Sequence, residues 1–354
     1  MPSIRSSTRA AVFAGVFAAL LAAGCAGRQK TSDKATHFQA EGARAYARGD
    51  LDRAAGLFSL ALEYEPKMAL ARNGLGLVAM ARGDTEAAEQ QFKTALSLDE
   101  ELAEAHLNLG YILLDRGDME EAHTHFRQAL AIDPGFGAAR LAVAEVLIRT
   151  NKIEEARWEL VKLTEIDPQN AKVHAAYAKV LAKQGRIAAA EAAAQKALSL
   201  DAELPEGHQA RGEILKRRGD LVSAAEAYRK VVTARPMSID DRVSLVTVLV
   251  GSNQIDAAEV ELQGLEKTAP QRAEVAFVRG YVALQRNQLD LAIAASTRAL
   301  KLRRPYPEAR MILAEALYRA GRSDDGRREL QEFLKEAPSG MQAERQRAQQ
   351  FLNQ

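Results

Sequence analysis

The sequence predicts an all-α protein: an α-solenoid of about nine 34-residue helix–turn–helix repeats with a C-terminal capping helix. The first observation is the spacing of six of the ten prolines, whose successive separations are 68, 34, 68, 34 and 68 residues: Pro66, Pro134, Pro168, Pro236, Pro270 and Pro338. The second is a set of small residues in the same frame, and the third is that no segment has a strand-like pattern. A fixed period between about 20 and 50 residues marks a repeat array.

Each repeat is numbered here so that this proline falls at position 32, which gives nine repeats between residues 35 and 340 without an insertion. Small residues at positions 8 and 20 let the two helices of a repeat cross closely. Position 8 carries Gly42, Gly76, Gly110, Ala144, Ala178, Gly212, Val246, Gly280 and Ala314. Position 20 carries Ala54, Ala88, Ala122, Ala156, Ala190, Ala224, Ala258, Ala292 and Gly326. Val246 is the bulky exception, and we expect it to loosen the helix crossing of the seventh repeat.

The turn and the apolar stripes follow the same frame. Position 15 is always glycine or asparagine, which accept the left-handed backbone at the end of a helix. Large apolar residues dominate positions 7, 11 and 24, with Phe58, Phe92 and Phe126 at position 24 of the first three repeats. Positions 7 and 11 lie four residues apart on the first helix and position 24 lies on the second, so each helix carries one apolar stripe.

This pattern of small and large residues resembles the tetratricopeptide repeat family over most of the chain. Asn-Leu-Gly-Tyr at residues 108–111 and Ala-Leu-Ala-Ile-Asp-Pro at residues 129–134 are close local matches. The resemblance implies a right-handed superhelix that binds proteins in a concave groove lined by the first helix of each repeat. Position 4, often aromatic in that family, departs from the pattern because it holds arginine or histidine in seven repeats.

The resemblance also implies which residues line the groove, namely those at positions 2, 5, 6, 9, 12 and 13. Two mainly apolar zones result, and an apolar partner is expected to bind there. The candidate partner-binding residues are Leu77, Met80, Asn108, Tyr111 and Leu114 in the first zone, and Phe277, Tyr281, Met311 and Tyr318 in the second. The alternative is that these side chains only pack between adjacent repeats. The lysine and arginine pattern with which some family members hold a free carboxylate is absent.

The composition and the motifs favour no other class of function. The 48 basic and 47 acidic residues give a net charge of +1, without the basic excess of nucleic-acid-binding proteins. His106, His174 and His208 recur at position 4 of different repeats, and His123 and His125 point in different directions on one helix. We therefore expect no metal site, no catalytic residue, no cofactor and no small-molecule substrate; the protein is not expected to be an enzyme.

The N-terminus resembles a bacterial lipoprotein signal. Arg5 and Arg9 precede an uncharged stretch from Ala10 to Gly27 that holds the only cysteine, Cys25. We expect a signal peptide over residues 1–24, lipidation of Cys25 and a short tether over residues 25–34. The resemblance implies attachment to the bacterial cell envelope, at the periplasmic face of the outer membrane because Ala26 is not aspartate. The alternative is cleavage after Ala26, which releases a soluble protein.

The predicted domains are thus the signal and tether, the array over residues 35–340, and a capping helix over residues 341–354 that covers the open end. The predicted function is a membrane-anchored periplasmic scaffold that binds partner proteins in its groove. The lipoprotein signal together with the array resembles pilotins and pilus-assembly lipoproteins, which assist secretins, and also polysaccharide-export lipoproteins. A regulatory or chaperone-like subunit of an envelope enzyme system is the alternative.

Overall fold

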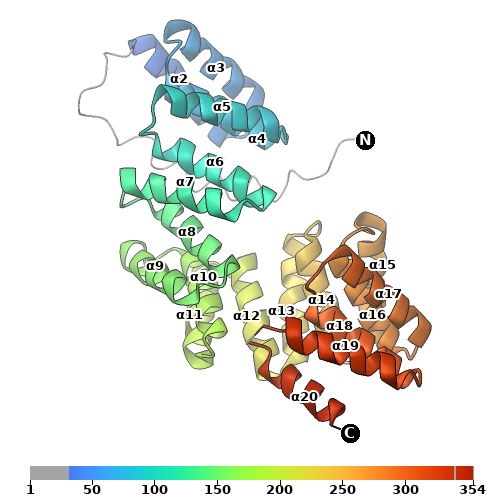
Figure 1. The fold of residues 1–354 in the computed structure, drawn as a ribbon. Coiled ribbons are helices and arrows are strands. Elements are labelled where there is room, and N and C mark those ends of the chain that lie inside the picture. Colours follow the sequence, from blue (N-terminus) through green and yellow to red (C-terminus); the bar gives the residue numbers. More distant parts are fainter. Residues whose placement is uncertain (1–31, 339, 354) are drawn as a thin grey trace. The chain divides into compact units, whose positions relative to one another are not determined.

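The computed structural model describes residues 32–338 and 340–353, and in this part of the chain it contains 19 α-helices and no strand (Figure 1). The predicted all-α class is therefore confirmed for these residues. The chain divides into two compact units, Met1–Asp201 and Ala202–Gln354. Cys25, the signal peptide and all but the last residues of the predicted tether lie outside the described residues.

Five helix pairs form the N-terminal unit, and successive helices pack against one another. These helices are α2 (Asp33–Ala47), α3 (Leu51–Tyr64), α4 (Ala69–Arg82), α5 (Thr85–Leu98), α6 (Ala103–Arg116), α7 (Met119–Ile132), α8 (Gly137–Arg149), α9 (Ile153–Ile166), α10 (Ala171–Lys183) and α11 (Ile187–Leu200). Helix α2 begins two residues before the predicted first repeat, so Asp33 and Lys34 are helical.

Four helix pairs and a final single helix form the C-terminal unit. These helices are α12 (Pro205–Arg218), α13 (Leu221–Ala234), α14 (Ile239–Gly251), α15 (Ile255–Thr268), α16 (Ala273–Gln285), α17 (Leu289–Leu302), α18 (Pro307–Arg319), α19 (Ser323–Glu336) and α20 (Gln342–Leu352). Helix α20 packs against α19, and Ala348 is buried there with Leu330 and Phe333. The Arg345 guanidinium donates to the carbonyl oxygens of Leu334 and Ala337, which satisfies acceptors at the end of α19.

The turn between the helices of a repeat follows from position 15. The backbone is left-handed at this position in all nine repeats, for example at Gly83 (φ 82°) and at Asn151 (φ 60°). The second helix then begins at position 17, and in three repeats the preceding aspartate caps it. Asp50, Asp84 and Asp220 each accept a hydrogen bond from a backbone N–H of the first turn.

The two helices of a repeat are held together by paired residues at positions 8 and 24. Where position 8 is glycine in the first, second, third and sixth repeats, an aromatic ring from position 24 lies against it. A Cβ added to Gly110 would lie 2.5 Å from Phe126, and one added to Gly212 would lie 2.8 Å from Tyr228. Where position 8 is alanine or valine, position 24 is leucine or alanine. The two sizes thus compensate each other in seven repeats, whereas the fifth and eighth pair two small residues, Ala178 with Ala194 and Gly280 with Ser296.

Val246 fits this rule of compensation. Its side chain is fully buried and belongs to one cluster with Leu262, the residue at position 24 of the same repeat. Nevertheless, α14 and α15 pack together less extensively than the two helices of any other described repeat, which agrees with the looser crossing expected from the sequence. Val246 is therefore well buried, although the two helices that it joins are the least closely packed pair within a repeat.

A second pairing joins position 4 of the first helix to position 23 of the second. In the fourth repeat Arg140 Nη1 donates to Glu159 Oε2 at 2.7 Å, and Arg242–Glu261 and Arg310–Glu329 are the equivalent ion pairs of the seventh and ninth repeats. In the third repeat the same place holds His106 and His125. In these four repeats the departure from the family pattern at position 4 is thus a polar contact inside the repeat.

Candidate protein-binding surface

The first helices place most of the first predicted zone in the interior. Leu77, Met80 and Leu114 are buried in one cluster that spans the second to fifth repeats. A buried side chain contributes to the packing of adjacent repeats and presents little surface to a partner. For these three residues the structure thus matches the alternative of packing, and a partner-binding role for them stays a prediction.

Asn108 is buried as well, and it has a structural partner. Its Nδ2 donates to Oδ1 of Asn73 at 3.0 Å, and this hydrogen bond joins α6 to α4. Buried amides are costly unless they are hydrogen-bonded, so the pair fixes the register of two neighbouring first helices. Asn108 consequently serves the array itself.

Tyr111 is the half-buried member of this zone. Its ring meets the Phe126 ring edge-to-face, with centroids 5.2 Å apart. Burial, and secondly the negative charge of Glu145, raise the pKa of the Tyr111 hydroxyl well above its ordinary value. The side chain therefore stays neutral and combines an apolar ring with a hydroxyl that can donate.

Two residues of the second zone, Phe277 and Tyr281, form a connected set with Tyr306, which the sequence analysis did not name; we call these three residues the aromatic group. The Phe277 and Tyr281 rings lie one helical turn apart on α16 and stack with centroids 6.3 Å apart. Tyr306 is buried, and its ring centroid lies 5.3 Å from that of Phe277. Phe277 and Tyr281 are half-buried, so part of each ring is open to contact. Burial raises the pKa of Tyr281, with Glu315 as a smaller cause.

Met311 and Tyr318 lie at the other end of this zone, where α20 packs. Both side chains contact the buried cluster that α20 completes, and the Tyr318 ring centroid lies 5.8 Å from that of Phe351. Both are half-buried. The structure therefore brings Phe277 and Tyr281 together, and it places Met311 and Tyr318 in a separate cluster with the final helix.

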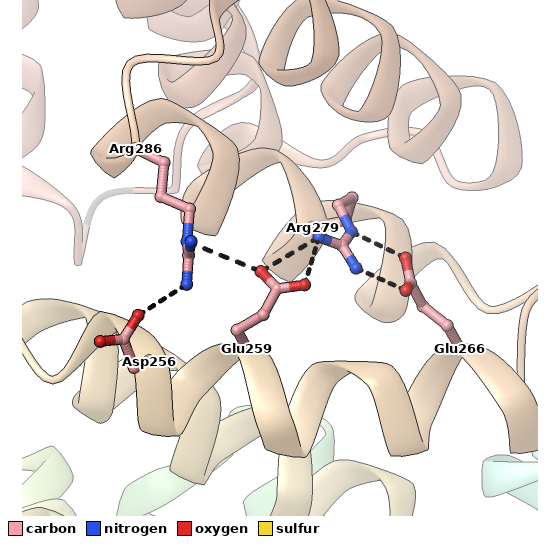
Figure 2. A network of polar contacts seen from close by, with 5 residues as sticks. All are labelled: Asp256, Glu259, Glu266, Arg279 and Arg286. Carbon is pink, nitrogen blue, oxygen red and sulfur yellow. Dashed lines mark hydrogen bonds and ion pairs between the residues drawn. The ribbon is translucent and has the colours of Figure 1, made fainter.

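A polar network between the seventh and eighth repeats was missed by the sequence analysis (Figure 2). Arg279 of α16 reaches Glu259 and Glu266 of α15, and Arg286 reaches Asp256 and Glu259. Hydrogen bonding to Glu266 is the main reason that the pKa of Arg279 is raised. The signal was present, because Arg279 occupies position 7, where six repeats have a large apolar residue.

The histidine contact in the third repeat was also missed. His106 Nδ1 and His125 Nδ1 are 2.9 Å apart, and His106 Nε2 lies 3.1 Å from the Glu100 carbonyl oxygen. A carbonyl only accepts, so His106 Nε2 donates to it and neutral His106 accepts the proton of His125 at Nδ1. Burial lowers the pKa of both rings, which favours this neutral pair. In residues 32–338 and 340–353, no group of three or more His, Cys, Asp or Glu could hold a metal ion.

None of the described helices has both the length and the apolar character that a membrane span requires. This finding concerns only residues 32–338 and 340–353.

Comparisons with known proteins identify the repeats. Sequence models described as "Tetratricopeptide repeat" match residues 40–103, 74–135, 113–180, 175–238, 243–307 and 294–341. No curated protein sequence matches the chain significantly.

Solved structures provide the similarity in fold. A Pseudomonas aeruginosa pilF structure aligns with a TM-score of 0.51 and 18% identity, over 60% of this chain and 97% of that one. A tetratricopeptide repeat protein from Parabacteroides merdae aligns with a TM-score of 0.54 and 14% identity, over 71% of this chain and 99% of that one. A structure of the Cut9–Hcn1 hetero-tetramer of the APC/C aligns with a TM-score of 0.63 and 16% identity, over 79% of this chain and 55% of that chain.

Proposed function

The chain belongs to the tetratricopeptide repeat family, and we propose that it is a scaffold of the bacterial cell envelope, anchored to the membrane through a lipid on Cys25. Repeats of this family generally hold other proteins. The finer proposal is that the first helices of the C-terminal unit bind a partner protein and thereby assist the assembly of an envelope complex such as a pilus or a secretin.

The aromatic group is the observation that carries this proposal. Aromatic side chains provide large contact areas at little entropic cost, and they are enriched at the centres of protein interfaces. Phe277 and Tyr281 are held in place by stacking and by the buried Tyr306, so a partner would meet a preorganised surface. Leu77, Met80, Asn108 and Leu114 offer no comparable surface because they are buried.

The membrane anchor is supported by the sequence of the N-terminus. Its basic residues, its apolar stretch and Cys25 have the order of a lipoprotein signal. One acyl chain binds a membrane only marginally, whereas two or more chains hold a protein on it stably. We expect Cys25→Ser to abolish labelling with radioactive palmitate and to shift the protein from the membrane fraction to the soluble fraction. Unchanged membrane fractionation would contradict the anchor.

Site-specific photocrosslinking in intact cells tests the binding surface. A photoreactive phenylalanine replaces Tyr281 in one variant and Val260 in the control, since Val260 is exposed on a second helix of the same unit. We expect a discrete protein crosslink from position 281 that is absent at position 260, and Phe277→Ala should weaken it. The same products from both positions, or none from position 281, would overturn the proposed surface.

A role in polysaccharide export, or as a regulatory or chaperone-like subunit, is the alternative that the N-terminal signal and the array support equally. The likeness to pilF shows the fold alone, at 18% identity. The identity of the crosslinked protein distinguishes the two roles: a secretin or pilus component supports assembly, and an export protein supports the alternative.

A further inference from the structure

The eighth repeat contains a cavity on the side of the array formed by second helices. Its volume is about 300 Å³, and it lies between α15 and α17 with α16 as its floor. Ala276 of α16 forms part of the floor, Leu291 and Ala295 of α17 form one wall, and Glu266 of α15 forms the other. Glu266 is the end of the network in Figure 2, so its carboxylate is already engaged by Arg279.

The cavity coincides with an exception in the pairing of positions 4 and 23. These positions are Ala276 and Ala295 in the eighth repeat, whereas every other repeat has at least one larger side chain at one of them. The fourth repeat fills the same place with the Arg140–Glu159 ion pair, and the ninth fills it with Arg310 and Glu329. Two methyl groups cannot occupy that volume, so the place between the helices is open.

The eighth repeat has no side chain at position 4 that can reach the backbone carbonyl oxygen that position 4 contacts in other repeats. In four repeats the side chain at position 4 contacts the carbonyl oxygen six residues before it, as Arg140 does with Pro134 and His174 with Pro168. In the eighth repeat Ala276 cannot reach the corresponding oxygen of Pro270. Arg298 of α17 donates to it at 2.8 Å and also lies 3.2 Å from Gln271 Oε1.

The charge of Arg298 is not neutralised by these contacts. Both of its described hydrogen-bond partners are neutral groups, and its side chain is exposed. Residues 291–307 also include Lys301, Arg303 and Arg304 and contain no acidic residue, although Arg303 is paired with Glu274. Among the lining residues Glu266 and Arg279 pair with each other, so the apolar floor is accompanied by the positive charge of Arg298, which attracts a negatively charged group.

We propose that this cavity binds one apolar side chain from an acidic segment of a partner protein, with a neighbouring carboxylate of that segment on Arg298. The side chain takes the volume that Arg140 and Glu159 fill in the fourth repeat. The lining residues do not include Phe277, Tyr281 or Tyr306, so the site stands independently of the proposed function.

Three short peptides test this assignment with the full chain. The acidic peptide acetyl-Asp-Glu-Phe-Glu-Asp-amide has the proposed chemistry, a second peptide replaces its acids with Asn and Gln, and a third replaces Phe with Ala. Methyl NMR follows the resonances of Leu291 and Ala295. We expect saturable shifts with a Kd of about 1 mM for the acidic Phe peptide, since a single anchor and one charged contact give weak binding, and much weaker binding for the other two.

Two variants with a matched position provide the structural control. Ala294 is exposed at the rim at position 22, so Ala294→Trp should fill the cavity from outside without disturbing the core. Ala192→Trp makes the same change at the exposed position 22 of the fifth repeat, where His174 occupies position 4. We expect Ala294→Trp to abolish the shifts and Ala192→Trp to preserve them. The Arg298→Gln variant should bind the acidic peptide no more tightly than the peptide in which Asn and Gln replace the acids.

The results that overturn the assignment are distinct from these. Absence of saturable shifts at about ten times the expected Kd, equal binding of the acidic and neutral peptides, or unchanged binding by Ala294→Trp would each refute it. Concentration-dependent dimerisation that Ala294→Trp abolishes would identify a second copy of the chain as the occupant, and would also refute the proposed acidic segment.

Discussion

The fourth and eighth repeats have the same helix–turn–helix arrangement but differ in the side chains at positions 4 and 23: two charged residues in the fourth repeat and two alanines in the eighth. In the fourth repeat Arg140 and the fully buried Glu159 form an ion pair, and Arg127 Nη1 lies 2.7 Å from the same carboxylate. In the eighth repeat two alanines leave a cavity. The comparison teaches that this contact is not required to form a repeat. The residues at positions 4 and 23 decide instead whether the space beside the second helix is filled by side chains or left as a cavity.

The comparison also shows that residues in this array are exchanged as pairs. A buried ion pair can be replaced by apolar residues with little loss of stability, whereas the loss of one partner leaves an uncompensated charge. The pairs at positions 8 and 24 follow the same logic with volume instead of charge, as Gly110 with Phe126 and Val246 with Leu262 illustrate. The first three predictions below disturb one member of such a pair, and the last concerns the network in Figure 2.

The largest effect is expected for Glu159→Ala, which leaves Arg140 without its buried partner. The free energy of unfolding should fall by about 3–5 kcal/mol, measured by urea denaturation. The double variant Arg140→Ala/Glu159→Ala gives the fourth repeat the residues of the eighth, and it should lose clearly less than Glu159→Ala alone. If the double variant is less stable than Glu159→Ala, the two residues of this contact cannot be replaced together at a smaller loss than one alone.

Val246→Ala tests the pairing by volume in the seventh repeat. The substitution should leave a small cavity beside Leu262 and lower the free energy of unfolding by about 1–3 kcal/mol, because the side chain is fully buried. Thermal and urea denaturation both measure it. An increase in stability would show instead that the side chain of Val246 holds α14 and α15 apart, as the looser crossing expected from the sequence implies.

The His106–His125 contact of the third repeat should make stability depend on pH. Burial lowers both pKa values below the ordinary value of 6.5, so below that pH the unfolded chain binds more protons than the folded one. Stability is therefore complete above about pH 6.5 and falls as the pH decreases. We expect a loss below about 1 kcal/mol, since His125 is only half-buried and solvent screens its charge.

The matched variant for this pH dependence is His125→Gln, which places at position 23 the residue that the second repeat has there. It should reduce the slope of stability against pH between pH 7.5 and 5.5, in a series of urea titrations. Burial also lowers the pKa of His123 and of His208, so part of the slope should persist. An unchanged slope would show that the pair does not contribute.

The smallest effect is expected for Arg286→Ala at the edge of the network in Figure 2. Its partner Asp256 is almost fully exposed, so the free energy of unfolding should change by less than about 0.5 kcal/mol. Arg279→Ala is the comparison, because its contacts to Glu259 and Glu266 are more shielded and its loss should cost more. Equal losses in the free energy of unfolding would mean that the solvent exposure of an ion pair does not decide its contribution in this network.

The periodic features of the fold were predictable from the sequence because they depend on local chemistry. Position 15 requires a left-handed backbone, and Gly83 and Asn151 adopt it. The apolar stripes follow helical periodicity, and Phe58, Phe92 and Phe126 are fully buried as that periodicity requires. The bounds of the first helix were less predictable, since Asp33 and Lys34 extend α2 beyond the repeat frame.

The candidate surface was predicted less well, because exposure depends on neighbours from other repeats. Position 5 of the ninth repeat, Met311, lies in the groove frame like every other position 5, yet α20 packs beside it. Asn108 has the polarity of a binding residue but is hydrogen-bonded to Asn73, which lies 35 residues before it in the sequence. The sequence contains both residues, but it does not state that their helices meet.

The sequence by itself determined the repeat length, the turn positions, the helical class and the family, since each of these is repeated in the residues nine times. Only the tertiary structure decided which side chains are covered, which charges are paired and where the alanines of the eighth repeat leave an open volume. The reason is physical: periodicity specifies the direction of a side chain from its own helix, whereas burial and pairing depend on what the adjacent helices place opposite it.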